Sequence, residues 1–142
     1  MILTRNPVPE RMDAEQSSPP VLVAEDNHLN QVVADGMLRL LGYTSHCVAD
    51  GLQAVAALHN GHYPIVLMDV HMPHLDGYEA TRRVRTGLPP HRQPYIIALT
   101  ASVLPEDAEK CRAAGMNDFV TKPISKTTLA AALQRAEQSA TT

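Results

Sequence analysis

Residues 65–77 read IVLMDVHMPHLDG, an apolar run that ends in the acid Asp69 and leads into a segment with histidine, proline and glycine. A short apolar run followed by turn residues is typical of a strand buried on both faces of a parallel sheet. Asp69 is therefore expected at the carboxyl end of a buried strand. Open α/β sheets bind their ligands at that end of their strands, so Asp69 is the first candidate functional residue.

Four more polar side chains follow apolar runs in the same way, and they are Glu25, Asp26, Thr100 and Lys122. If the strands are parallel neighbours, all of these side chains meet at one edge of the sheet. Together with Asp69, Glu25 and Asp26 make three acids, whose like charges disfavour one another's ionisation unless a cation is present. Mg²⁺ is the expected cation, because it prefers oxygen ligands and is usually held by one or two carboxylates together with a phosphoryl group.

The same set of side chains suits phosphoryl transfer. Lys122 carries a mobile positive charge that can hold one phosphoryl oxygen, and the Thr100 hydroxyl can donate to another. The sequence shows no Ser, Cys or His dyad of the kind that other nucleophiles require. The pattern therefore indicates a carboxylate nucleophile at Asp69, with aspartyl phosphate as the covalent form.

Four motifs stand in order along the chain, each after an apolar run: EDNHLN at 25–30, LMDVHMPHLDG at 67–77, ALTA at 98–101 and FVTKPI at 119–124. In these motifs the chain resembles a response-regulator receiver domain of the type found in hybrid sensor histidine kinases, from about residue 20 to about residue 135. The resemblance implies an α/β fold with a five-stranded parallel sheet, flavodoxin-like and doubly wound in (βα)5 order. It also implies a role in two-component phosphorelay signalling.

The resemblance assigns a role to the acids and to His71. Asp69 would accept a phosphoryl group from a phosphohistidine, carried by a histidine kinase or a histidine-phosphotransfer domain. Mg²⁺, for which Mn²⁺ can substitute, would be held by Glu25, Asp26, Asp69 and the backbone carbonyl of His71. Glu25 stands where many receivers have Asp, and it would reach the metal through a water molecule or with its longer arm.

The resemblance also implies a response to phosphorylation. Thr100 and Lys122 would bind the phosphoryl group, and Pro123 belongs to the loop that follows Lys122. Phe119 would change rotamer together with Thr100 as a switch, although it lacks the hydroxyl of the Tyr found there in many relatives. The surface formed by the fourth helix, the fifth strand and the fifth helix would then change, and a homodimer through this surface is left open.

Outside the motifs, short apolar runs alternate with helical patterns, as expected for βα units in a parallel sheet. The predicted strands cover residues 21–24, 44–48, 64–69, 94–99 and 117–120. The predicted helices are one that ends at Gly42, three at residues 51–60, 76–86 and 105–114, and one capped by Ser125. Right-handed crossovers place helices on both faces of the sheet. The apolar helix positions expected to face the sheet are Val33, Met37, Leu40 and Leu41, then Leu52, Val55, Ala56 and Leu58, and finally Leu129, Ala132, Leu133 and Ala136.

Residues 21–138 are expected to form the receiver domain, after a flexible linker or tail at 1–20 and before a tail at 139–142. The linker is predicted from its prolines and polar residues, a composition that buries little surface. A chain of 142 residues has no room for a kinase as well. The chain itself is therefore expected to be a phosphoacceptor signalling domain and not an enzyme, and a hybrid histidine kinase is the parent polypeptide that the resemblance allows.

Composition excludes several other classes of protein. The net charge is −3 and no Lys/Arg run exists, so no nucleic-acid contact is expected. No apolar stretch reaches the ~18 residues that cross a bilayer, so no membrane contact by this chain is expected either. Cys47 and Cys111 form no zinc spacing. A cytoplasmic location follows as the expectation, which includes the cytoplasmic part of a membrane-bound sensor kinase.

Two other functions remain open. A receiver can bind its partner without being phosphorylated, although the complete set of acids, Thr100 and Lys122 argues against this. A haloacid-dehalogenase-like phosphatase also uses an Asp nucleophile and Mg²⁺, but that family has a second Asp two residues later, where this chain has His71. Two H-x-x-H pairs, His59 with His62 and His71 with His74, raise the possibility of a transition-metal site. The favoured alternative is that these histidines are solvated loop residues.

Overall fold

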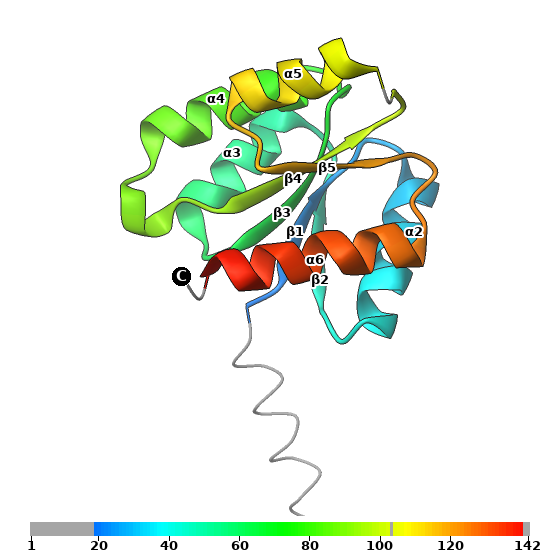
Figure 1. Ribbon diagram of the computed structural model, residues 1–142. Coiled ribbons are helices and arrows are strands. Elements are labelled where there is room, and N and C mark those ends of the chain that lie inside the picture. Colours follow the sequence, from blue (N-terminus) through cyan, green and yellow to red (C-terminus); the bar gives the residue numbers. More distant parts are fainter. Residues whose placement is uncertain (1–18, 103, 141–142) are drawn as a thin grey trace, which may run out of the picture.

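A computed structural model describes residues 19–102 and 104–140, which form a five-stranded sheet covered by helices on both faces (Figure 1). The strands are β1 (Val21–Ala24), β2 (Ser45–Val48), β3 (Ile65–Asp69), β4 (Tyr95–Thr100) and β5 (Asp118–Thr121). All neighbouring pairs are parallel, and the order across the sheet is β2-β1-β3-β4-β5. This is the flavodoxin-like, doubly wound order, so the predicted fold class is confirmed.

The helices cover the sheet in two layers. The helices α2 (His28–Leu40) and α6 (Lys126–Ala140) lie on one face, and α3 (Gly51–Asn60), α4 (Gly77–Gly87) and α5 (Pro105–Ala114) lie on the other. A short 3₁₀ turn, η1 (Pro90–Arg92), precedes β4. The helix α6 runs to Ala140, past the predicted domain boundary at 138. The predicted linker, apart from Pro19 and Pro20, lies outside the described residues.

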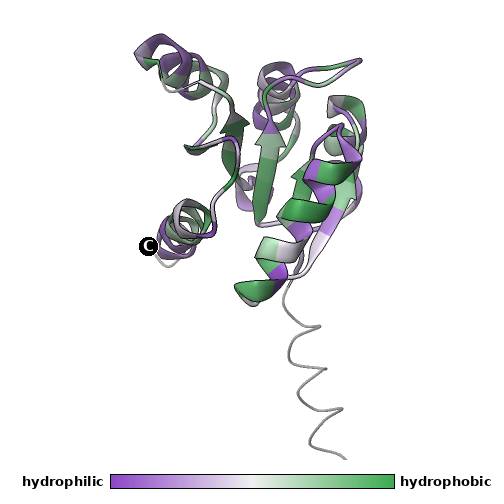
Figure 2. Ribbon diagram, turned by 90° about the vertical axis from the view of Figure 1, so that its right-hand side faces the viewer, coloured by the Kyte–Doolittle hydropathy of each residue, from purple (hydrophilic) through white to green (hydrophobic). Residues whose placement is uncertain are grey.

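Alternate residues of the central strands supply the two cores. Val66 and Met68 of β3 pack with α3, α4 and α5, whereas Ile65 and Leu67 pack with α2 and α6. Every residue of β1 and β3 is buried, and the strands are coloured as hydrophobic in Figure 2. A strand buried on both faces is why these segments read as continuous apolar runs and not as alternating ones.

The predicted apolar faces were right for α6 and partly right for α2 and α3, where Met37, Leu41, Val55 and Leu58 do pack against the core. In α6 all of the predicted positions are buried. In α2 the fully buried residues are Ala34 and Leu38, while Val33 and Leu40 are 40% and 73% exposed. In α3 they are Gly51, Ala54 and Leu58, whereas Leu52 and Ala56 are exposed. The small residues allow each helix to lie close to the sheet, and a pattern of large apolar residues does not predict that choice.

Gly77, the first residue of α4, lies directly against the end of β3. Its amide donates to the Val70 carbonyl at 3.0 Å, and a Cβ at this position would stand 2.2 Å from the Asp69 carbonyl oxygen. Asp76 caps the helix by accepting a hydrogen bond from the Glu79 amide. The segment between Asp69 and α4 is therefore fixed tightly at both of its ends.

We expect Gly77→Ala to lower the free energy of unfolding by about 1–3 kcal/mol, because the added methyl group must displace backbone and not a flexible side chain. Gly36→Ala is the matched control. Gly36 lies inside α2 with nothing within 4 Å of its Cβ position, so alanine there should raise the free energy of unfolding by about 1 kcal/mol through helix propensity. Urea denaturation of both variants measures the change in the free energy of unfolding. Equal changes in the two variants would contradict the close contact at Gly77.

Candidate functional site

The structure brings the predicted polar residues to one edge of the sheet. Glu25 and Asp26 follow β1, Asp69 is the last residue of β3, and Thr100 is the last residue of β4. Lys122 follows β5, and its amide donates to the Thr100 carbonyl at 2.8 Å. Carboxylate oxygens from the three acids lie within 4.8 Å of one another. The convergence follows from parallel strands that end in register.

Lys122 bridges two buried acids. Its Nζ atom donates to Asp69 Oδ2 at 2.9 Å and lies 3.1 Å from Glu25 Oε1. Asp69 and Glu25 are only 3% and 1% exposed. Burial acts to lower the pKa of Lys122, but the hydrogen bond and charge of Asp69, together with Glu25, outweigh burial and raise the pKa. The ammonium group is therefore the counter-ion of both carboxylates. The peptide bond from Lys122 to Pro123 is cis.

Glu25 leaves one carboxylate oxygen unsatisfied. Its Oε2 accepts a hydrogen bond from the Asn27 amide at 3.0 Å, whereas the buried Oε1 has only the charge of Lys122 Nζ, 3.1 Å away, and accepts no hydrogen bond from the described residues. Buried polar atoms normally have a partner. An unsatisfied carboxylate oxygen in a cluster of three acids fits a hard divalent cation, so the residues present suit Mg²⁺.

Asp69 is oriented by two contacts. Its Oδ1 accepts a hydrogen bond from the His71 amide at 3.2 Å, and its Oδ2 accepts one from Lys122. The His71 side chain is exposed, so only its main chain belongs to the site. The predicted metal contact of its carbonyl stays a prediction.

Thr100 and Phe119 occupy the side of the site formed by β4 and β5. Thr100 is buried, and its hydroxyl oxygen accepts a hydrogen bond from the Ser102 amide at 3.2 Å. The Ser102 hydroxyl in turn donates to Asp107 in the first turn of α5. The Phe119 ring is exposed on β5. The loop after Thr100 is thus attached to α5, a connection that the sequence analysis did not predict.

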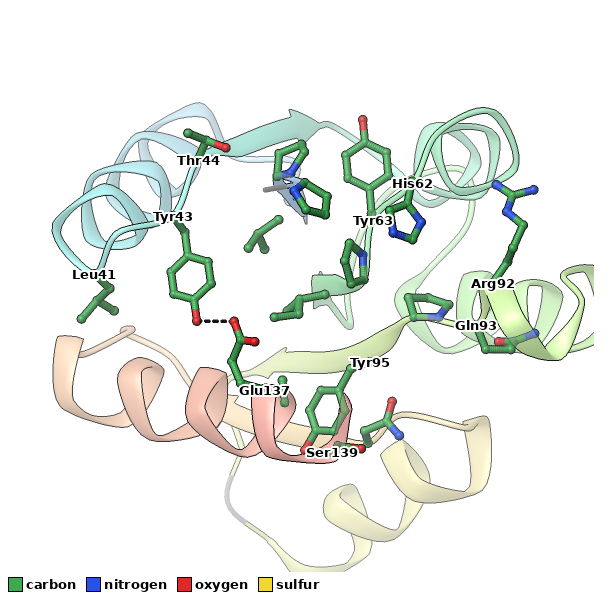
Figure 3. A pocket seen from close by; sticks show the side chains of 18 of the residues that line it. Leu41, Tyr43, Thr44, His62, Tyr63, Arg92, Gln93, Tyr95, Glu137 and Ser139 are labelled. Carbon is green, nitrogen blue, oxygen red and sulfur yellow. Dashed lines mark hydrogen bonds between the residues drawn. The ribbon is translucent and has the colours of Figure 1, made fainter. Parts of the chain in front are cut away.

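A cavity lies at a different edge of the sheet from these residues. An open depression of about 1150 Å³ is lined by Val21, Ile65 and Tyr95, which start their strands, so it lies at the opposite edge of the sheet from Asp69. Figure 3 shows its side chains, with the Tyr43 hydroxyl donating to Glu137 at 2.9 Å. None of the acids, Thr100 or Lys122 lines it. The acidic site is therefore separate from this depression.

The histidine pairs do not join the acids. Within residues 19–102 and 104–140, the only group of three potential metal ligands within reach of one another is the acidic one. His74 instead contacts Asp50, a residue that the sequence analysis did not single out. The turn signal Ala49-Asp50-Gly51 was visible in the sequence, but its partner 24 residues away was not. No helix in the described part of the chain is long and apolar enough to cross a membrane.

Comparison with known proteins agrees with this geometry. A family model described as the response regulator receiver domain matches residues 21–134. The hybrid signal transduction histidine kinase H of Dictyostelium discoideum is 41% identical over 120 residues, which cover 82% of this chain and 9% of the relative. The chain spans 9–16% of the length of the first curated relatives that it matches. Each of these relatives is therefore a much longer protein.

Two solved structures are also similar. One is the receiver domain of the sensor histidine kinase PA1611 of Pseudomonas aeruginosa, with a magnesium ion coordinated in its active site cleft. It is 47% identical with a TM-score of 0.74, covering 82% of this chain and 94% of that one. The other is the Saccharomyces cerevisiae receiver domain of Ssk1 in complex with the histidine phosphotransfer protein Ypd1. It is 30% identical with a TM-score of 0.71, covering 78% and 82%.

Proposed function

The chain belongs to the response-regulator receiver family of two-component signalling, and we propose that it accepts a phosphoryl group on Asp69 from a phosphohistidine in an Mg²⁺-dependent step. The observation that carries the proposal is the arrangement of Asp69, Lys122 and the unsatisfied Glu25 oxygen at the rim of the sheet. The proposed donor is a histidine kinase or a histidine-phosphotransfer domain, by analogy with the complex described above.

In the proposed reaction an Asp69 carboxylate oxygen attacks phosphorus, the bond from phosphorus to the imidazole nitrogen breaks, and the nitrogen keeps the electron pair. Lys122 Nζ, 2.9 Å from Asp69 Oδ2, is placed to offset the charge of the transferred group. Mg²⁺ would be held by Glu25, Asp26, Asp69 and the His71 carbonyl and would neutralise phosphoryl charge, with Mn²⁺ as a substitute. The Thr100 hydroxyl, which accepts from Ser102, keeps its own proton to donate to a phosphoryl oxygen.

The output would use the other side of the site. A new bond from Thr100 to the phosphoryl group pulls on the loop that Ser102 and Asp107 attach to α5. The exposed Phe119 ring can then turn inward beside Thr100. The changed surface consists of α5, β5 and α6, and a homodimer or another partner would bind there. The proposed location is cytoplasmic, as a domain of a larger kinase.

An apolar stripe on α2 supports a protein donor. Leu29, Val32 and Leu40 are 68%, 53% and 73% exposed, and Val33 lies beside them. Residues three or four apart share one helix face, so the stripe starts three residues after Asp26 and continues away from the acids. Since Asp69 itself is buried, a protein donor must bind the surface next to it to bring its phosphohistidine close. An exposed apolar stripe there fits such a contact.

We therefore expect Leu29→Asp to slow phosphotransfer from a phosphorylated histidine-phosphotransfer domain about tenfold, the loss of roughly 1.4 kcal/mol of contact energy. Phosphorylation by acetyl phosphate should be unchanged, because this small donor needs no docking surface. The control is Leu52→Asp, which replaces an exposed leucine on α3, across the sheet from α2. Radiolabel transfer in single-turnover assays measures the rate for the wild type, Leu29→Asp and Leu52→Asp with each donor. Equal slowing by both donors would argue against a docking role, and no transfer to the wild type would remove the proposed function.

A further inference from the structure

The loop between Asp69 and α4 has a second attachment, to the turn before α3. His74 Nδ1 lies 2.9 Å from Asp50 Oδ2, and the neighbouring Gly51 amide donates to the Leu75 carbonyl at 3.1 Å. A Cβ on Gly51 would stand 2.1 Å from that carbonyl oxygen, so the two chain segments touch backbone to backbone. The loop is thus fixed at its ends by Asp69 and Gly77 and in its middle by Asp50 and Gly51.

Asp50 is a rigid anchor for this contact. It is buried, and it divides its two oxygens between two tasks. Oδ1 caps α3 by accepting from the Gln53 amide at 2.8 Å, and Oδ2 faces His74. These hydrogen bonds, that of Gln53 first, lower the pKa of Asp50, so the carboxylate is ionised at neutral pH and accepts a proton donor from the loop.

His74 adopts a left-handed backbone conformation, which most residues other than glycine avoid. Its φ angle is 67°, in the left-handed region where glycine is the usual occupant and Asn, Asp and His are the commonest other residues. The left-handed angle still costs free energy for a residue that carries a Cβ. The contact between the imidazole and Asp50 offsets this cost.

We propose that His74 is a positioning residue that, through Asp50, holds the loop in the conformation in which the His71 carbonyl can bind Mg²⁺. This inference rests on the proposed function, since it concerns the same metal. Without the contact the loop populates other conformations as well, and the apparent affinity for the metal falls in proportion to the population that is competent to bind. His74 itself touches neither the metal nor the phosphoryl group.

The test uses two substitutions that both tolerate the left-handed angle. His74→Gly removes the contact, whereas His74→Asn keeps an amide that can donate to Asp50. The control is His46→Ala. His46 lies on the edge strand β2, and its imidazole is hydrogen-bonded to the Tyr63 hydroxyl. We expect Mg²⁺ to bind His74→Gly about two- to fivefold more weakly than wild type, as for an exposed ion pair, and His74→Asn to recover most of the affinity. NMR titration of backbone amides with Mg²⁺ alone gives the dissociation constants.

A second measurement needs no metal. Amide exchange at Gly51 should be faster in His74→Gly than in wild type, and restored in His74→Asn, because the Gly51 to Leu75 bond belongs to the same attachment. An unchanged dissociation constant in His74→Gly, or unchanged exchange at Gly51, would overturn the positioning role while leaving the proposed function intact. A wild type that binds no Mg²⁺ would overturn both.

Discussion

Asp69→Asn should abolish phosphorylation. With Mg²⁺ and acetyl phosphate, we expect the wild-type protein to gain one phosphoryl group that is released at alkaline pH, as an acyl phosphate is. An asparagine amide is not a nucleophile for phosphorus, while its size is close to that of the carboxyl group, so the fold should be kept. Intact-protein mass spectrometry before and after base treatment measures the label.

The matched control for that experiment is Asp76→Asn. Asp76 is an exposed acid in the same loop that caps α4, and asparagine is an equally good cap. This variant should be labelled as fast as the wild type. Label that persists in Asp69→Asn would assign the phosphoacceptor to another residue.

The second large effect concerns the metal. A ligand that binds only the folded protein stabilises it by about 2.7 kcal/mol at a hundredfold excess over its Kd, which corresponds to a rise in Tm of roughly 10 °C for a domain of this size. Saturating Mg²⁺ should produce this shift in the wild type. Asp26→Asn should lose most of it, because Asp26 is the acid of the cluster that Lys122 does not pair.

Differential scanning calorimetry with and without Mg²⁺ checks this expectation. Glu106→Gln, which removes an exposed acid from the first turn of α5, should keep the full response. In the absence of Mg²⁺, Asp26→Asn should be as stable as the wild type or more so, since it relieves repulsion among the acids. Equal Mg²⁺ shifts in Asp26→Asn and wild type would exclude Asp26 as a ligand.

The sequence predicted the sheet and the convergence of the five polar residues because both depend on strands. Continuous apolar runs identify strands buried on two faces, and residues at the ends of parallel strands meet without any further information. The acids, Thr100 and Lys122 were therefore found by position alone. Their chemical roles came from the resemblance to receivers, and the experiments above test those roles.

Features that depend on helix rotation or on loops were not predictable in the same way. On α2, apolar residues occur on both the buried and the exposed side, so the pattern selected Val33 and Leu40 where packing selects Ala34 and Leu38. The contact of His74 with Asp50 joins two loops, whose conformations follow no period. It becomes visible only when the backbone is known.

The separation of the acidic site from the exposed apolar stripe on α2 has a consequence for how such a protein acquires new partners. A site that encloses its substrate ties recognition to the reacting atoms, so a change of substrate disturbs the chemistry. Here the acids and Lys122 lie at the ends of the strands, while the exposed apolar stripe runs along the outside of α2. Substitutions on the stripe can therefore insulate one signalling route from another without altering the reaction itself.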